Sequence, residues 1–418
     1  MKIFIKTIKS LLMTIPGDVP FVEGHFMCEL NQLNDAWLAI EDGIIADYGS
    51  MNDFDGIEDW RNLTIIDASG RFVLPAWCDS HTHTVFAKSR AGEFEDRLRG
   101  LTYEEIAKRG GGILNSAKNL QAMSEDDLYI QAFERLNFMM QHGTGAVEIK
   151  SGYGLTAESE LKMLRVIKRL KESHPITIQS TFLALHAIPE TYSGDVDAFV
   201  NHMIQDVLPI VASEKLADFV DVFCEKGYFS VDHMTQLLKA ASDYGIQGKV
   251  HVNQFNNLGA VEQAVTLGAR SVDHLELVSN EDLASLKNSK TMAVALPGCS
   301  LFLEIPYTEA RRIMEENIPL ALATDFNPGS APNSNMNLVN SLACIKMKML
   351  PNEVVQASTI NAAYAMDVHH TLGSISRGKK ANIILTKPLD SISEMFYYFG
   401  QSPVDGVILN GKVERSID

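Results

Sequence analysis

The sequence has little cysteine, and its few cysteines suggest no pairing. Five occur in 418 residues, an odd number without any CxxC spacing, at Cys28, Cys78, Cys224, Cys299 and Cys344. This usage excludes a disulfide framework of the secreted type and is typical of a reduced chain. We therefore expect a cytoplasmic protein.

Positive charge and long apolar runs are also scarce. Lys and Arg number 36 against 53 Asp and Glu, which gives a formal net charge of -17. Nucleic acids and anionic membranes attract a positive field, so this balance excludes both as general partners. No run approaches the roughly 20 apolar residues of a membrane helix. Lysines interrupt the apolar N-terminus, and no signal-peptide cleavage site follows it. A small anionic substrate remains compatible, because one arginine can bind a carboxylate.

The composition itself is that of a globular chain, with 46% hydrophobic and 21% charged residues. Both chain ends carry β-hairpin signals, because Asp42-Gly43 and Asn410-Gly411 each separate two short apolar segments. The two ends resemble each other and differ from the centre. We therefore predict one discontinuous, β-sandwich-like domain formed from residues 1–72 and 373–418.

The centre, residues 73–372, alternates short apolar runs with helical patterns. Nearly continuous apolar runs indicate strands buried on both faces, and eight β-α units over about 290 residues match a (β/α)8 TIM barrel. An open, doubly wound sheet is the alternative, and no GxGxxG or GxxxxGK phosphate motif occurs. The count of eight favours the barrel. The runs are Phe72–Pro75 leading into Asp79-Ser80-His81, Gly145–Lys150, Ile176–His186, Phe219–Cys224, Lys249–Val252, Ser271–Leu275, Thr291–Leu296 and Leu320–Asp325.

Polar residues at the ends of these runs indicate a metal site. His81 and His83 stand two apart on the first strand and so point to the same side. An HxH pair alone is weak, but His251, His274 and Asp325 end the fifth, sixth and eighth runs. Barrel active sites lie at this carboxyl end of the strands. Three of these histidines together with the carboxylate are a donor set that suits Zn²⁺ or Fe.

This placement of histidines and aspartate resembles the amidohydrolase superfamily. Within it, the chain resembles the imidazolonepropionase family over residues 72 to 335. The segments that carry the resemblance are HTHTVFAKSRAGEFEDRLRGLTYEEIAKRGGGI, EIKSGYGL, TFLALHAIP, DVFCEKGYFS, HVNQFNNLGA, SVDHLE, LPG and ALATDFNPGS.

The resemblance implies a function and its residues. One divalent or trivalent metal ion, zinc or iron, is expected to bind His81, His83, His251 and Asp325. The implied substrate contacts are Arg90, Tyr153, His186, Gln254, Asn327, Gly329 and Ser330. The implied catalytic residues are Asp325, His274 and Gln254. The implied reaction is hydrolysis of 4-imidazolone-5-propanoate to N-formimino-L-glutamate, by a homodimer.

The chemistry agrees with these residue types. A guanidinium such as Arg90 suits the propanoate, and Tyr153 adds a hydroxyl donor. A bound metal lowers the pKa of water from 15.7 to about 7, and Asp325 is the expected base. His274 and His186 are placed to polarise the carbonyl. Whether Asp325 or His274 protonates the ring nitrogen stays open.

Structural interpretations stay open beside these roles. Arg90 alternatively forms a surface ion pair with Glu93 or Glu95, and we interpret Arg97 and Arg99 as structural. His186 alternatively bonds a backbone group, and Gln254 a neighbouring loop. We expect Cys224 to be a buried apolar residue. Strand 4 ends in Glu225 without a lysine to bridge two metals, which favours one metal.

The chain departs from the family pattern at Thr84, Lys88-Ser89, Ala184-Leu185, Ser330 and Asn333. Two other functions remain open. One is another superfamily hydrolase or deaminase acting on a small heterocycle, against which a carboxylate anchor argues. The other is a non-catalytic barrel scaffold, against which the retained metal ligands argue.

Overall fold

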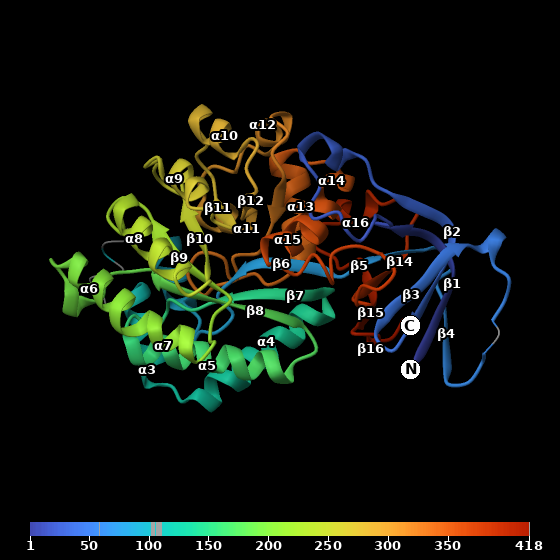
Figure 1. The fold of residues 1–418 in the computed structure, drawn as a ribbon, viewed down its shortest axis with the longest axis horizontal. Coiled ribbons are helices and arrows are strands. Elements are labelled where there is room, and N and C mark those ends of the chain that lie inside the picture. Colours follow the sequence, from blue (N-terminus) through green and yellow to red (C-terminus); the bar gives the residue numbers. More distant parts are fainter. Residues whose placement is uncertain (58, 102–104, 106–110, 418) are drawn as a thin grey trace.

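The computed structural model describes residues 1–57, 59–101, 105 and 111–417. In this part of the chain the strands form two eight-stranded sheets, one parallel and central, the other mixed and built from both chain ends. Figure 1 shows the parallel sheet enclosed by helices and the mixed sheet beside it, with both termini on the mixed sheet. The predicted fold class is confirmed, while the exact domain boundaries remain a prediction.

The central strands follow one another around the barrel in chain order. They are β6 (Trp77–Thr82), β7 (Thr144–Lys150), β8 (Thr177–Leu185), β9 (Phe219–Cys224), β10 (Gln247–Val252), β11 (Ser271–His274), β12 (Met292–Ala295) and β13 (Leu320–Leu322). The chain closes the barrel just beyond β13. The Asp325 N–H donates to the His81 carbonyl oxygen at 2.9 Å, and the His83 N–H donates to the Phe326 carbonyl oxygen at 2.8 Å. This closure brings the eighth strand end beside the first.

The first predicted run is divided between the two sheets. Phe72–Pro75 lies in β5 (Arg71–Pro75) of the mixed sheet, whereas Asp79-Ser80-His81 lies in β6 of the barrel. The chain changes sheets between two neighbouring residues. The Ala76 N–H donates to Asn382 of the terminal domain at 2.9 Å, whereas the Trp77 N–H donates to Gly143 before β7 at 2.9 Å. An apolar run cannot reveal such a switch, because both sheets bury it.

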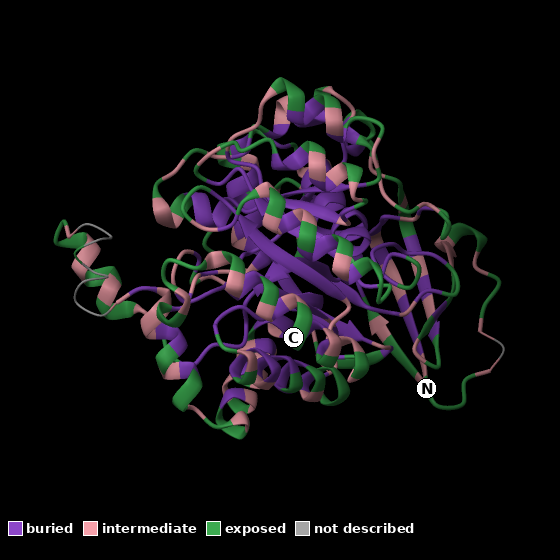
Figure 2. Ribbon diagram, turned by 60° about the vertical axis from the view of Figure 1, so that its left-hand side comes forward, coloured by how far each residue is buried: buried purple, intermediate pink, exposed green. Residues whose placement is uncertain are grey.

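Helices cover the outside of the barrel, with their apolar faces inward. In α5, the predicted positions Leu161, Leu164 and Ile167 are buried, and the Thr156 side chain caps the helix start. Figure 2 shows buried strands at the centre and exposed outer helix faces. No helix in the described ranges is apolar over a length that would cross a bilayer. The helices around the barrel are α1 (Ala91–Leu98), α3 (Ile113–Ala122), α4 (Glu125–Gln141), α5 (Ala157–Ser173), η3 (Glu190–Tyr192), α6 (Val196–His202), η4 (Met203–Val207), α7 (Leu208–Ser213), α8 (Val231–Ser242), α9 (Ala260–Thr266), α10 (Asn280–Leu286), α11 (Pro297–Leu303), α12 (Ala310–Glu315), α13 (Met336–Met347), α14 (Pro351–Gln356), η5 (Ala357–Asn361) and α15 (Ala362–Ala365).

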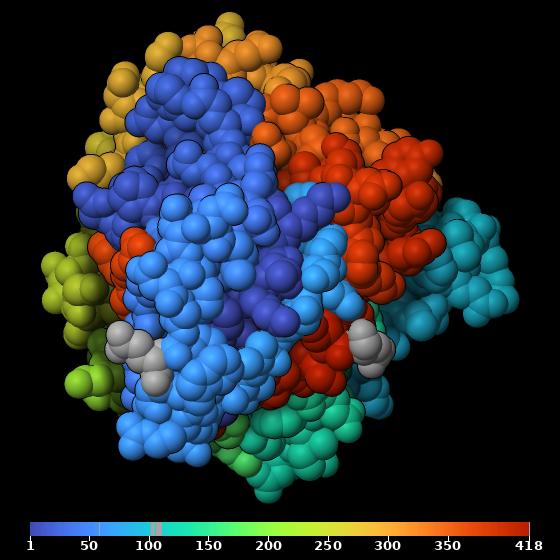
Figure 3. Space-filling view, turned by 90° about the vertical axis from the view of Figure 1, so that its right-hand side faces the viewer, coloured from blue at the N-terminus to red at the C-terminus, as the bar shows by residue number. Residues whose placement is uncertain are grey.

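The mixed sheet joins the two chain ends. Its order is β16-β15-β14-β5-β1-β2-β3, with β4 also paired to β1. Figure 3 shows residues from the two ends sharing one face of the molecule. Both predicted hairpins form, and their turns touch, because a Cβ on Gly411 would lie 2.5 Å from the Gly43 Cα. The remaining elements are β1 (Lys2–Leu12), η1 (Gly24–Cys28), β2 (Gln32–Glu41), β3 (Ile44–Ser50), η2 (Met51–Asp53), β4 (Leu63–Asp67), β14 (Ile383–Pro388), α16 (Glu394–Tyr397), β15 (Val404–Leu409) and β16 (Lys412–Arg415).

Candidate active site

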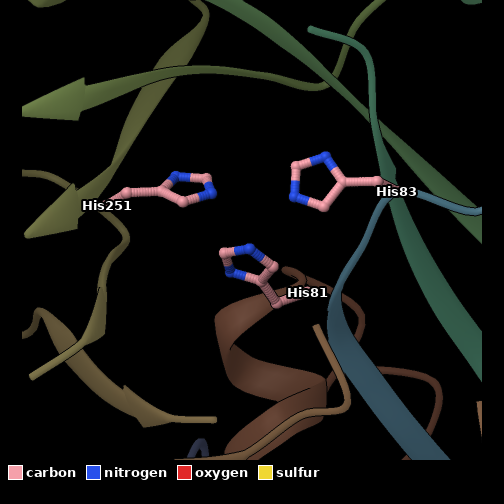
Figure 4. Close-up of side chains that lie close together, drawn as sticks. All are labelled: His81, His83 and His251. Carbon is pink, nitrogen blue, oxygen red and sulfur yellow. The ribbon is translucent and has the colours of Figure 1, made fainter. Parts of the chain in front are cut away.

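Three imidazoles meet at the carboxyl end of the barrel strands. His81 and His83 come from the end of β6, and His251 comes from β10. One ring nitrogen of each lies within 4.8 Å of the others, and all three residues are buried. Figure 4 shows the three rings turned toward a common point.

Asp325 completes the group from the end of the eighth strand. Its Oδ1 lies 3.5 Å from His81 Nε2 and 3.6 Å from His83 Nε2. In a tetrahedral site with Zn–N bonds of about 2.0–2.1 Å, ligand atoms lie roughly 3.4 Å apart. Asp325 has a left-handed backbone, with φ of 54°, which is costly for this residue type and typical of functional sites. The barrel-closing hydrogen bond to His81 holds it there.

The donor atoms fit a cation. His81 Nε2 and His251 Nε2 are buried and have no hydrogen-bond partner among the described residues. The same holds for Nδ1 of His83, whose Nε2 is the atom near Asp325. Such atoms cost free energy unless something satisfies them. Burial and the nearby Lys150 lower the pKa of His81, and burial and His186 lower the pKa of His83. Neutral imidazoles offer the lone pair that a metal needs.

Two buried carboxylates fix the orientation of two of these rings. Asp273 Oδ2 lies 2.7 Å from His81 Nδ1, and Asp221 Oδ2 lies 3.0 Å from His251 Nδ1. A carboxylate at Nδ1 favours the tautomer with its proton there, which leaves Nε2 free for a metal. The barrel therefore preorganises the ligand atoms.

A buried ionic network lies beneath the histidines. Lys150 Nζ lies 2.7 Å from Glu148 Oε1 and 2.7 Å from Asp221 Oδ2, and 3.5 Å from Asp273 Oδ2. Lys249 pairs with Glu148 in turn. Burial alone lowers the pKa of Lys150, but attraction from Asp221, Glu148 and Asp273 outweighs it and raises that pKa. The lysine therefore stays charged and holds the two orienting carboxylates together.

Sequence reasoning missed this network, although a signal was present. Lys249 stands two residues before His251 on β10, and side chains two apart share a face of a strand. The residue two positions before a histidine of the metal site on the same strand also points into the barrel. Examining those residues would have revealed charged side chains there. We instead read these strands as uniformly apolar.

His274 lies at the end of β11 beside the histidine group. Its ring centroid is 5.4 Å from that of His251 and 5.7 Å from that of His81. Its Nδ1 lies 3.3 Å from Glu276 Oε1. Burial lowers the pKa of His274, but Glu276 and the nearby aspartates raise it overall. A histidine with a raised pKa beside the metal group can donate a proton.

A cavity of about 570 Å³ lies beside the histidine group, because two of its lining residues, Tyr153 and His186, pack against the ring of His83. All seven expected substrate residues line it, namely Arg90, Tyr153, His186, Gln254, Asn327, Gly329 and Ser330. Gln254 Nε2 also lies 3.2 Å from Sγ of Cys299, which belongs to α11, so it contacts a neighbouring helix as well. The structure thus brings the expected residues into one space.

Two lining residues, His186 and Arg90, also make the structural contacts that were the alternatives to substrate binding. His186 Nδ1 lies 2.8 Å from the Gly152 carbonyl oxygen and donates to it, while its ring stacks on His83. Burial lowers the pKa of His186 to about 4, so the ring is neutral and Nε2 is an acceptor. Arg90 Nε donates to Glu93 Oε2 at 2.7 Å, which is the alternative ion pair.

Two loops are shaped by single side chains. Asn327 Oδ1 accepts from the Gly329 and Ser330 N–H groups at 2.8 and 2.7 Å. The buried Glu160 carboxylate accepts from the Gly152, Gly154 and Leu155 N–H groups at 2.7, 2.7 and 2.8 Å, and so fixes the loop that carries Tyr153. These hydrogen bonds define the shape of two loops of the cavity wall.

The chain matches known proteins over nearly its whole length. A family model described as the amidohydrolase family matches residues 72–413. An imidazolonepropionase of Christiangramia forsetii is 54% identical over 413 residues, 99% of this chain and 100% of the relative. An imidazolonepropionase of Clostridium tetani is 42% identical over 94% of both chains.

Solved structures share the fold at much lower identity. Guanine deaminase of E. coli superposes with a TM-score of 0.74 at 10% identity and covers 100% of both chains. An adenosine deaminase from Xanthomonas campestris with bound zinc has a TM-score of 0.71 at 14% identity, over 99% of this chain and 92% of the other. At such identities the likeness shows the fold alone.

Proposed function

The chain belongs to the amidohydrolase family and, within it, to the imidazolonepropionases, and on this premise we propose which residues perform its chemistry. Its activity is the hydrolysis of the cyclic amide of 4-imidazolone-5-propanoate to N-formimino-L-glutamate in histidine degradation. The observation that carries the residue assignment is the convergence of three imidazoles, each with one unpartnered buried nitrogen, and one carboxylate beside a cavity lined by arginine.

We assign one metal ion, zinc or iron, to His81, His83, His251 and Asp325. The nitrogen and oxygen donors support either metal, and the orphaned ring nitrogens support a cation at this point. When bound, such an ion supplies Lewis acidity and a nucleophile at neutral pH, by lowering the pKa of water to about 7.

The substrate carboxylate is assigned to the outer part of the cavity. Arg90 offers planar, paired donors for it, and Tyr153 adds a hydroxyl. The loop of Asn327, Gly329 and Ser330 lies beside Arg90, so its groups face the same end of the substrate. The imidazolone ring then extends toward the histidines.

Proton transfer is assigned to residues at the base. Asp325 receives the proton of the attacking water, because it is the carboxylate beside the histidine group. His274 and His186 polarise the carbonyl from the two sides of the ring. Gln254 orients the substrate amide, and the ring nitrogen takes its proton from Asp325 or His274.

We further propose a cytoplasmic homodimer. Five free cysteines support the location, since a secreted chain of this size would be expected to pair them. Size-exclusion chromatography with light scattering tests the dimer, and a monomeric mass at micromolar concentration would contradict it.

Hydrolysis of imidazolone propanoate before and after chelation tests the assignment. We expect turnover, its loss with chelator and its return with added zinc or iron, with metal analysis near one equivalent per chain. The Arg90→Ala variant should mainly raise KM, because a charge-assisted bond of about 1.5–3 kcal/mol is lost. Full activity in metal-free protein would refute the metal assignment, and faster turnover of guanine or cytosine would favour a deaminase.

A further inference from the structure

Two arginines of one short helix face the same wall of the cavity. Arg90 is the N-cap of α1 and Arg97 lies in its last turn, and both line the cavity beside Gly329. Arg97 Nη2 donates to the Gly329 carbonyl oxygen at 3.2 Å. A Cβ added at Gly329 would collide with Arg90 Nη1, so that guanidinium rests on the same residue. The two cations therefore flank one point of the wall.

The charge of Arg90 is already compensated. Glu93 lies 2.5 Å from Arg90 Nη2 and accepts from Nε at 2.7 Å. The second oxygen of Glu93 accepts from the Gly112 N–H at 3.0 Å, which fixes the carboxylate in place. The ion pair uses some of the five donors of the guanidinium and cancels its charge. Arg90 can still donate to a carboxylate through its remaining N–H groups, but it shares its charge with Glu93.

Arg97 differs from Arg90 in this respect. Its guanidinium lies 4.8 Å from the Phe302 ring centroid, and in the described part of the chain it makes no ion pair with a carboxylate. Burial and repulsion from Arg90 lower the pKa of Arg97, although a guanidinium remains protonated in proteins. Arg90, Glu93 and Arg97 together therefore carry a net charge of one positive unit. Because Glu93 pairs with Arg90, we assign this charge to Arg97.

We propose that Arg97 is a further substrate-binding residue, whose charge makes the cavity selective for substrates with a carboxylate. The inference rests on the proposed function and assigns the charge selectivity to Arg97, with Arg90 orienting the group. It also revises our interpretation of Arg97 as structural. A carboxylate bound between Gly329 and the two guanidiniums would neutralise this corner.

A purely structural role predicts a different result. If Arg97 only supports the Gly329 loop, its removal should weaken charged and neutral ligands equally. The discriminating quantity is therefore the ratio of affinities for 3-(imidazol-4-yl)propanoate and its neutral propanamide. Both share the ring and the chain length and differ in the charge at the end.

Arg97→Gln keeps a donor for the Gly329 carbonyl and removes the charge, while Arg97→Lys keeps the charge. Arg99→Met is the matched control, because Arg99 lies on the same helix but pairs with Glu95 on the surface. Calorimetry should show propanoate affinity falling about tenfold or more in Arg97→Gln, the factor expected for a charge-assisted contact. Propanamide affinity should be unchanged, and Arg97→Lys should recover part of the loss of propanoate affinity.

Equal weakening of both ligands, or no change in either, would overturn the inference. The same wild-type protein is assayed with imidazolone propanoate, so a failure of the proposed function is seen separately as an absence of turnover. Turnover by the wild type together with an unchanged affinity ratio in Arg97→Gln would refute Arg97 alone.

Discussion

The side chains buried by the two sheets differ in polarity. The mixed sheet of the chain ends encloses an apolar cluster that includes Ile3, Ile5 and Ile8 of β1 and Leu38 of β2. The barrel encloses, beneath its histidines, a fully buried network of charged side chains. Its members are Glu148, Lys150, Asp221, Lys249 and Asp273. One chain thus builds one interior from alternating apolar residues and another from ions.

The two interiors serve different purposes: the apolar one stabilises the fold, and the ionic one positions the residues of the active site. Buried ion pairs rarely stabilise a protein relative to apolar residues of the same volume, because desolvation costs as much as the attraction returns. The network is therefore better explained by its effect on the histidines. Asp273 orients His81, and Asp221 orients His251. The apolar cluster packs residues of the two chain ends against each other. Damage to each interior should consequently have a different readout.

The largest effect is expected from a ligand histidine. His251→Ala removes one of the converging ring nitrogens, so bound metal should fall far below one equivalent. Turnover should drop by more than about 10³-fold, since the loss of a single preorganised electrostatic group already costs 10²–10³. The control is His202→Ala, an exposed histidine paired with Asp206. Retention of metal and activity in His251→Ala would remove this residue from the site.

A smaller effect on both stability and metal is expected from Lys150→Met. It leaves Glu148, Asp221 and Asp273 without their shared cation, and breaking a buried pair costs about 3–5 kcal/mol. Metal affinity should also fall about 10–100-fold, as for other groups that support metal ligands. Denaturant unfolding and metal titration measure the two quantities. Lower stability with unchanged metal affinity would show that the network does not position the ligands.

The apolar interior should show the opposite pattern. Ile5→Ala removes buried methylenes from the mixed sheet, where Ile5 is fully buried, and should cost about 2–5 kcal/mol of unfolding free energy. Metal content and kcat/KM below the unfolding transition should not change, because Ile5 lies in the mixed sheet and belongs neither to the cavity lining nor to the histidine group. A changed metal content in Ile5→Ala would show that the two interiors are coupled.

The sequence predicted these interiors unequally. Hairpins around Asp42-Gly43 and Asn410-Gly411 were readable because their turn chemistry is local. The barrel was readable from eight repeated units, and His81 and His83 were readable from their spacing of two. Lys150 and Asp221 were not recognised, because their partners lie on other strands and only the closed barrel brings them together.

The remaining misses also depend on distant parts of the chain. The switch from β5 to β6 occurs within one apolar stretch, and only the partners of Ala76 and Trp77 reveal it. Whether Arg90 was paired could not be decided from sequence either, since both Glu93 and Glu95 lie within five residues of it along the chain. The structure selects Glu93 because its position three residues on places its carboxylate against Arg90.

The smallest expected effect is on the pH dependence of the free energy of unfolding. It also distinguishes the barrel from the mixed sheet. The strands of the mixed sheet contain no histidine, whereas His174 is buried after α5. His174 Nδ1 accepts from the Ile176 N–H at 3.1 Å, and its Nε2 lies 3.2 Å from Asn137 Oδ1. This arrangement holds the neutral ring. Burial correspondingly lowers the pKa of His174 to about 4.

The sign of the pH dependence follows from this pKa. An unfolded histidine binds a proton below about pH 6.5, but folded His174 does so only near pH 4. Between these values the unfolded state holds more protons, so stability falls as the pH falls. His174→Asn should reduce that slope by up to about 1.4 kcal/mol per pH unit, measured by urea unfolding at pH 4.5 to 7. Ile5→Ala should lower the free energy at every pH and keep the slope, since it removes no proton site. An unchanged slope in His174→Asn would mean that the acid sensitivity of the barrel resides in other groups.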